Sequence, residues 1–80
     1  MPRKPSRRLP SDLPTERVRR AFERLGFAFD HEGSRHTIYR DPQDSQRFVS
    51  IPWHSRMKRD LLRGILRGVG VSEEAFMEQY

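Results

Sequence analysis

The first part of the chain carries the hydrophobic spacing of an amphipathic helix. Four hydrophobic residues recur every three or four positions, as on one face of a helix: Val18, Ala21, Phe22 and Leu25. Thr15 and Glu16 are typical of a helix start, and Gly26 is typical of a stop. The pattern predicts a helix over residues 15–25.

Alternating patterns follow and predict an antiparallel meander of three strands. Phe27 and Phe29 have one residue between them, so we expect both rings to point toward the core. A turn at Gly33-Ser34 and a second turn over residues 41–45 separate the strands. The strands are expected over residues 27–32, 36–40 and 46–51.

The second and third predicted strands each have a core face and an open face. With a period of two, Thr37 and Tyr39 share one face, which we assign to the core. His36, Ile38 and Arg40 then project from the open face. On the third strand, Val49 and Ile51 are assigned to the core in the same way.

The pattern of the last third of the chain predicts a basic loop followed by two helices. Residues 52–59 are expected to form the loop, with Ser55 as a possible helix cap. A longer helix, ended by Gly70, buries a hydrophobic stripe: Leu61, Leu62, Ile65, Leu66 and Val69. A short helix opens at Ser72 and brings Ala75, Phe76 and Tyr80 over the end of the core. The order of elements predicts an α+β fold.

Composition narrows the class of protein. The 80 residues suffice for one small domain, which we place at residues 14–80, behind a disordered basic arm over residues 1–13. The net charge is +5, and fourteen of the sixteen basic residues are arginines, which favours nucleic acid or an acidic protein as partner. No cysteine, membrane span or secretory signal is present, so we expect a soluble cytoplasmic protein without disulfides.

His36 is the candidate catalytic residue, as a general acid or base, because histidine exchanges protons near neutral pH. It could remove the proton from an RNA 2′-hydroxyl, so that this oxygen attacks the adjacent phosphorus without a metal ion. Arg35, Arg40 or Arg47 could stabilise the charge that develops on the phosphate. The alternative is a purely structural role, in which the His36 side chain only closes the turn by hydrogen bonding.

The other two histidines are expected to be ordinary surface residues, although His31 could share the open face of the sheet and His54 lies in the basic loop. The spacings of His31 and His54 match no zinc pattern, so neither a metal nor another cofactor is expected. Trp53 either stacks on a base or closes the core. Together with His54, it heads a group of possible RNA contacts in the basic loop that continues with Lys58 and Arg59.

Several segments in this order resemble the HicA family of mRNA interferase toxins. They include residues 20–27, the Gly33-Ser34 turn with its histidine, residues 39–42, residues 49–52 and the Leu62-to-Gly70 run. The resemblance implies a fold like that of double-stranded-RNA-binding domains, a ribonuclease with a strand histidine, and a HicB-type antitoxin as partner. Counting back from Tyr39 places His36 on the family histidine, whereas counting forward from Gly33-Ser34 places Arg35 there. Arginine cannot exchange protons at neutral pH, so His36 is preferred.

Two other functions remain open from the sequence. A domain of the same fold could bind RNA through phosphates and 2′-hydroxyls without cleaving it. Alternatively, the basic face could serve only to bind a protein partner. Dependence of activity on His36 separates the enzyme from both.

Overall fold

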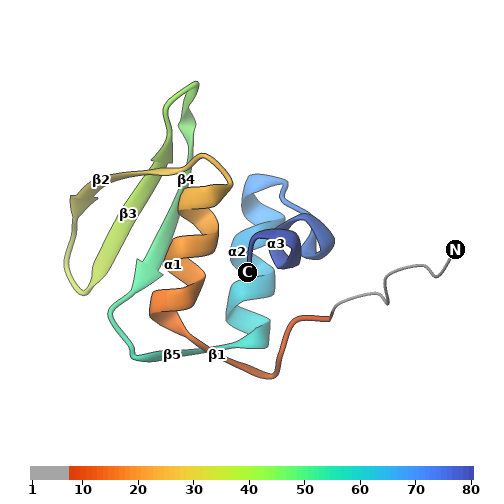
Figure 1. Ribbon diagram of the computed structural model, residues 1–80. Coiled ribbons are helices and arrows are strands. Elements are labelled where there is room, and N and C mark those ends of the chain that lie inside the picture. The colour runs from red at the N-terminus through yellow and green to blue at the C-terminus, as the bar shows by residue number, and fades with distance from the viewer. Residues whose placement is uncertain (1–7) are drawn as a thin grey trace, which may run out of the picture.

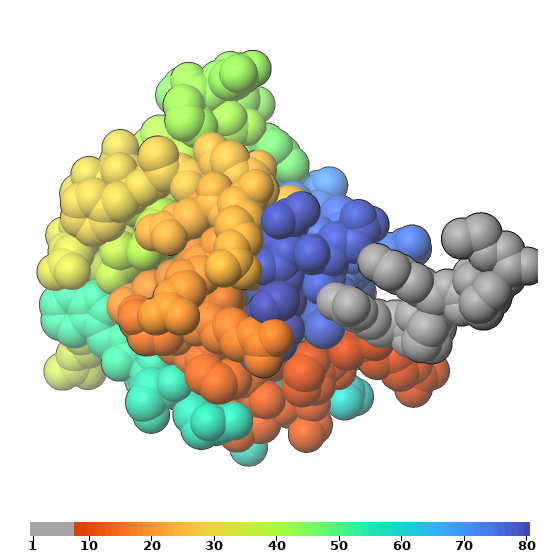
Figure 2. All heavy atoms as spheres, in the orientation of Figure 1, coloured from red at the N-terminus to blue at the C-terminus, as the bar shows by residue number. Residues whose placement is uncertain are grey.

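A three-stranded antiparallel sheet forms one layer of the protein, and helices form the other (Figure 1). The computed structural model describes residues 8–80. The sheet has the order β2 (Ala28–Glu32), β3 (His36–Asp41) and β4 (Asp44–Pro52). On one of its faces lie α1 (Thr15–Arg24) and α2 (Arg59–Val69), with α3 (Glu73–Gln79) against α1 (Figure 2). The predicted α+β fold with an antiparallel meander is confirmed.

Local sequence explains where the helices begin and end. Glu16 and Asp60 lie in the first turns of α1 and α2, where acidic side chains favour the positive end of the helix dipole. Gly70 ends α2 with a φ of 71°, a left-handed conformation that glycine adopts without penalty. The Ser72 hydroxyl accepts a hydrogen bond from the backbone N–H of Ala75 and caps α3. The predicted cap at Ser55 is wrong, because α2 begins after Lys58.

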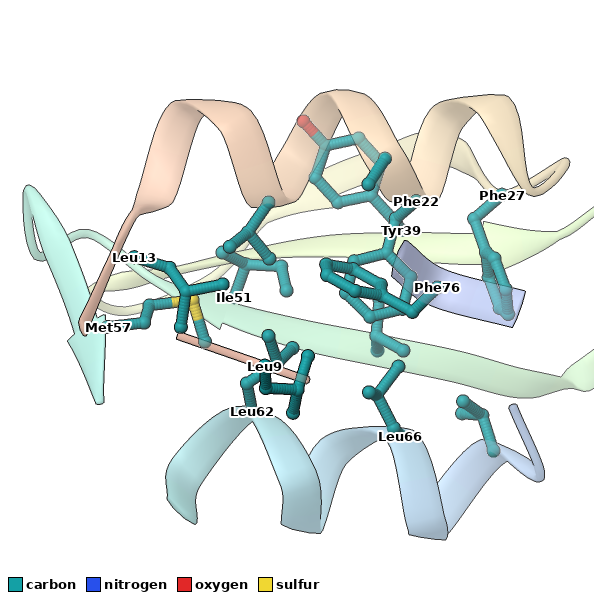
Figure 3. Packing of buried hydrophobic residues seen from close by; sticks show 14 of the residues in the cluster. Leu9, Leu13, Phe22, Phe27, Tyr39, Ile51, Met57, Leu62, Leu66 and Phe76 are labelled. Carbon is teal, nitrogen blue, oxygen red and sulfur yellow. The ribbon is translucent and has the colours of Figure 1, made fainter. Parts of the chain in front are cut away.

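The hydrophobic core fills the space between the helices and the sheet (Figure 3). Phe22 is fully buried at its centre, with its ring 5.6 Å from Phe27 in an edge-on contact and 5.4 Å from Phe76. The predicted core residues Tyr39, Val49 and Ile51 are buried as expected, and so are Val18, Leu62, Leu66 and Val69. Met57 and Met77 belong to the core as well, which the sequence pattern did not indicate.

A second, two-stranded sheet joins the start of the described chain to the segment before α2. In it β1 (Asp12–Pro14) pairs antiparallel with β5 (Arg56–Lys58), placing Leu13 opposite Met57. Leu9 and Leu13 are both buried in the core. The packed chain therefore begins before residue 14, where we expected it to start, and residues 56–58 are a strand rather than loop. Residues 1–7 of the predicted arm lie outside the described residues.

Two hydrophobic side chains that we assigned to the core are exposed. Phe29 is 58% exposed, although its ring makes an edge-on contact with Tyr39 at 6.3 Å. Phe29 lies on β2, an edge strand of the sheet. Leu61 is 45% exposed on α2. The buried stripe of that helix is narrower than its hydrophobic residues suggested.

In residues 8–80 no helix combines the length and the hydrophobicity that a bilayer crossing requires.

Candidate active site

The candidate site lies on the face of the main sheet that the helices leave uncovered. Thr37 and Tyr39 are buried toward the helices, so His36, Ile38 and Arg40 point to the other side, as predicted. Residues that pair across an antiparallel sheet share a face. The open face therefore also carries the pairing partners of Ile38 and Arg40: His31, Ser50, Ala28 and Phe48.

A tight turn holds the His36 imidazole at the end of β3. The Gly33 N–H donates to the His36 carbonyl at 2.8 Å, and the Trp53 N–H donates to the Arg35 carbonyl at 3.1 Å. Arg35 lies between them with a φ of 64°, in the left-handed region that side chains other than glycine rarely adopt. The turn is thus held by one hydrogen bond within it, from Gly33, and by one from the neighbouring segment, from Trp53.

The two nitrogens of the exposed His36 ring have different surroundings. Nδ1 lies 3.0 Å from the Ser34 carbonyl, which only accepts hydrogen bonds, so Nδ1 carries the proton in the neutral ring. Nε2 makes no hydrogen bond to any residue from 8 to 80, and in that tautomer it holds the lone pair. The hydrogen bond expected for a structural role of His36, from Nδ1 to the Ser34 carbonyl, is therefore present. It orients the ring and leaves Nε2 accessible as a base.

The open face also carries a carboxylate with two partners. The Asp30 carboxylate lies 2.6 Å from His31 Nδ1 and 3.4 Å from an Arg40 nitrogen. The hydrogen bond from His31 and then that from Arg40 hold the pKa of Asp30 below its usual value of 3.8. Arg40 also donates to the Ser45 carbonyl and lies over the exposed Phe48 ring, 5.1 Å from its centroid. This arrangement fixes a cation on the same face as His36, four residues farther along β3.

Arg47, which we expected among the RNA contacts, lies on the opposite face of the sheet. Its Nε donates to the Val69 carbonyl at 2.9 Å, and its Nη1 forms an ion pair with Asp41 at 3.0 Å. The hydrogen bond from the Gln43 N–H, and then that from Arg47, lower the pKa of Asp41 below its usual value of 3.8. Arg47 joins the end of α2 to β4 and is separated from His36 by the sheet.

The basic loop contributes only its first part to the surroundings of His36. Trp53 is half exposed, and its indole N–H donates to the Thr37 hydroxyl at 3.1 Å. The exposed His54 follows it. Lys58 lies opposite Asp12 in the small sheet, and the Arg59 N–H donates to the Ser11 carbonyl at 3.1 Å. Lys58 and Arg59 thus belong to the junction with β1.

Sequence reasoning did not find Asp30. An aspartate beside a histidine in an alternating strand carries no signal of its own, because which face each side chain takes depends on the register. In residues 8–80 no three histidine or acidic side chains come together as a possible metal site.

A comparison with models of known protein families finds a match over most of the chain. The model of the HicA toxin of bacterial toxin-antitoxin systems matches residues 15–71, from the start of α1 to just beyond α2. The chain belongs to the HicA toxin family. None of the curated proteins compared with it matches. Membership of the HicA family makes the chain the toxin of a toxin-antitoxin pair, with an antitoxin as partner, and implies a function of the ribonuclease type.

Proposed function

We propose that this HicA toxin is a metal-independent endoribonuclease that cuts mRNA with His36 as general base, in the cytoplasm, and that a HicB-type antitoxin neutralises it. The observation that carries the proposal is the state of the His36 ring: Nδ1 is held by the Ser34 carbonyl, the side chain is exposed, and Nε2 makes no hydrogen bond to residues 8–80. A fixed, accessible imidazole is what proton abstraction requires.

In the proposed reaction, His36 Nε2 takes the proton from a ribose 2′-hydroxyl. The 2′-oxygen then forms a bond to the adjacent phosphorus, and the bond from phosphorus to the 5′-oxygen breaks. The leaving 5′-oxygen takes up one proton, so that the products are a 2′,3′-cyclic phosphate and a 5′-hydroxyl. The nucleophile comes from the RNA itself. One positioned acid or base supplies about 10²- to 10⁴-fold of rate.

Two arginines are proposed to bind the phosphates. Arg40 lies on the same strand face as His36, and Asp30 and the Ser45 carbonyl already orient its guanidinium. Arg35 lies next to His36 in the turn, and its exposed side chain makes no hydrogen bond to any described residue. Arg35, adjacent to His36, is proposed to stabilise the negative charge that develops on the phosphorane. Arg40, four residues farther along β3, is proposed to bind a flanking phosphate.

Aromatic side chains are proposed to hold the flanking bases. Phe48 is 47% exposed on the open face, and Trp53 is 50% exposed beside the turn. Exposed rings next to a cationic track are typical of single-strand binding, because every base offers a face for stacking. His54, and more remotely Lys58 and Arg59, extend the proposed RNA contacts along the chain after Trp53.

The proposal is tested by incubating a long single-stranded RNA with wild-type protein and with His36→Ala in EDTA. Circular dichroism checks that both are folded, and Glu74→Gln on the exposed side of α3 serves as control. We expect wild type and the control to cleave, and His36→Ala to lose about 10²-fold or more of the rate. Equal cleavage by wild type and His36→Ala would refute the role of His36. RNA binding by both without cleavage would favour a non-catalytic RNA-binding module.

A further inference from the structure

A β-bulge in β2 brings a second histidine to the open face. Phe29 pairs with Tyr39 and His31 pairs with Ile38, so Asp30 is an extra residue with no partner on β3. Without the extra residue, strict alternation would place His31 on the same side as Phe29, toward the helices. The bulge reverses this and turns both Asp30 and His31 to the side of His36. Bulges next to functional sites commonly re-aim side chains in this way.

His31 and His36 are consequently diagonal neighbours on adjacent strands. His31 lies opposite Ile38, and His36 is two residues from Ile38 on the same face of β3. Diagonal neighbours in an antiparallel pair are about 7–8 Å apart between their Cα atoms. Both imidazoles are exposed, and the Arg40 guanidinium occupies the same face. A phosphodiester between the two rings could contact both.

The hydrogen bond of the His31 side chain occupies one ring nitrogen and leaves the other available for proton transfer. Its Nδ1 is 2.6 Å from the ionised Asp30 carboxylate, which only accepts hydrogen bonds, so Nδ1 carries a proton. Nε2 makes no hydrogen bond to any residue in the described chain. A carboxylate in this position fixes the orientation of the ring. When the ring is doubly protonated, Nε2 carries a proton as well. That form can donate its Nε2 proton.

The pair is poorly explained as a stabilising ion pair. The His31 side chain is 56% exposed and the Asp30 side chain is 37% exposed. Ion pairs at such exposed positions contribute little to stability. The bulge also takes one residue out of the pairing between β2 and β3. A role in chemistry accounts for this arrangement better than a role in stability does.

We propose that His31 is a second catalytic residue, the general acid that protonates the leaving 5′-oxygen, and that Asp30 is its positioning residue. This inference rests on the ribonuclease function proposed above. While His36 removes the 2′-hydroxyl proton, His31 Nε2 gives its proton to the 5′-oxygen as the bond from phosphorus to that oxygen breaks. One proton enters the protein at His36 and one leaves at His31. The charge of the site is therefore unchanged over the step.

The test compares two substrates that differ in their leaving group. In RNA the leaving 5′-alkoxide needs a proton, whereas in uridine 3′-(4-nitrophenyl phosphate) the nitrophenolate leaves without one. Loss of a general acid therefore slows the first reaction and spares the second. We expect His31→Ala to cleave RNA about 10²-fold more slowly and the nitrophenyl ester less than about fivefold more slowly. His31→Gln, which keeps a polar side chain, should behave in the same way.

His36→Ala and Asp30→Asn complete the design. His36→Ala should be slow on both substrates, because both need the 2′-hydroxyl deprotonated. Asp30→Asn should slow RNA cleavage about tenfold more than ester cleavage, since the His31 ring loses its orientation but stays present, whereas loss of the Arg40 ion pair affects both substrates alike. A purely structural role of His31 would slow both substrates equally.

The outcomes separate this inference from the function on which it rests. If wild type cleaves neither substrate, the ribonuclease proposal fails. If wild type cleaves both and depends on His36, but His31→Ala cleaves RNA at the wild-type rate or loses equal activity on both substrates, only the general-acid role of His31 is overturned.

Discussion

Replacing Arg35 by glycine should stabilise the protein. Arg35 holds a φ of 64°, and a side chain in this left-handed conformation costs roughly 1–2 kcal/mol. Glycine removes this strain but has more conformational freedom in the unfolded chain, which offsets about 0.5–1 kcal/mol. The exposed Arg35 side chain makes no hydrogen bond to the described residues that would be lost. The net expectation is a gain of about 0.5–1 kcal/mol and a rise in Tm of about 2–8 °C.

Urea unfolding at pH 7 measures this change, with Ser34→Gly as the matched control. Ser34 occupies the same turn, but its φ is not positive, so glycine there has only the entropic effect. Ser34→Gly should lose about 0.5–1 kcal/mol. If Arg35→Gly were as unstable as Ser34→Gly, the backbone strain at Arg35 would not outweigh the entropic cost of glycine, and the reasoning would be refuted.

The same substitution tests the proposed phosphate contact. In a His36→Ala background, which keeps the RNA intact, Arg35→Gly should weaken binding to single-stranded RNA. The slope of log K against log salt concentration should become smaller by about 0.7, the value for one neutralised phosphate. Arg35→Lys should keep most of the slope. An unchanged slope in Arg35→Gly would remove Arg35 from the RNA contacts.

Three further predictions follow from the packing and charges. Leu9→Ala should lower the free energy of unfolding by about 2–5 kcal/mol, measured in urea, whereas a loss below about 0.5 kcal/mol would mean that the segment before β1 is not part of the core. The pKa values of Asp30 and Asp41 are lowered by folding, so both carboxylates stabilise the protein above their usual value of 3.8 and lose this effect as the pH falls below it. The double Asn variant should therefore lose less stability than wild type between about pH 5 and about pH 2, and an identical loss would contradict the shifts. Arg47→Gln should lower the free energy of unfolding by about 1 kcal/mol. It should weaken RNA binding less than Arg40→Gln does, and a greater loss of RNA binding in Arg47→Gln would contradict the placement of the two arginines on opposite faces of the sheet.

The sequence was sufficient to predict the elements that have a regular period. Spacing of three or four residues located α1, and alternation divided β3 correctly into a buried face with Tyr39 and an open face with His36. The same alternation on β4 carried information that we did not use. Arg47 has the parity of Val49 and Ile51, which places it on the helix side of the sheet, away from His36.

Other features depended on contacts between distant segments. β1 and β5 have three residues each, too few to show a period, and each is a strand only because it pairs with the other. The bulge at Asp30 likewise depends on how β2 meets β3, and it decides that His31 shares the face of His36. The exposed Phe29 follows from its place on the outer strand, where the helix layer leaves its ring uncovered.

The chemical nature of the RNA ends tests the central claim most directly. An oligoribonucleotide is incubated with the wild-type protein in EDTA, and the products are identified by mass spectrometry, beside the same strand with one 2′-deoxynucleotide at the main cleavage site. Attack by the 2′-oxygen predicts a 2′,3′-cyclic phosphate and a 5′-hydroxyl, and no cut at the deoxynucleotide. A 5′-phosphate, or a cut after the deoxynucleotide, would show that water is the nucleophile and would contradict the mechanism.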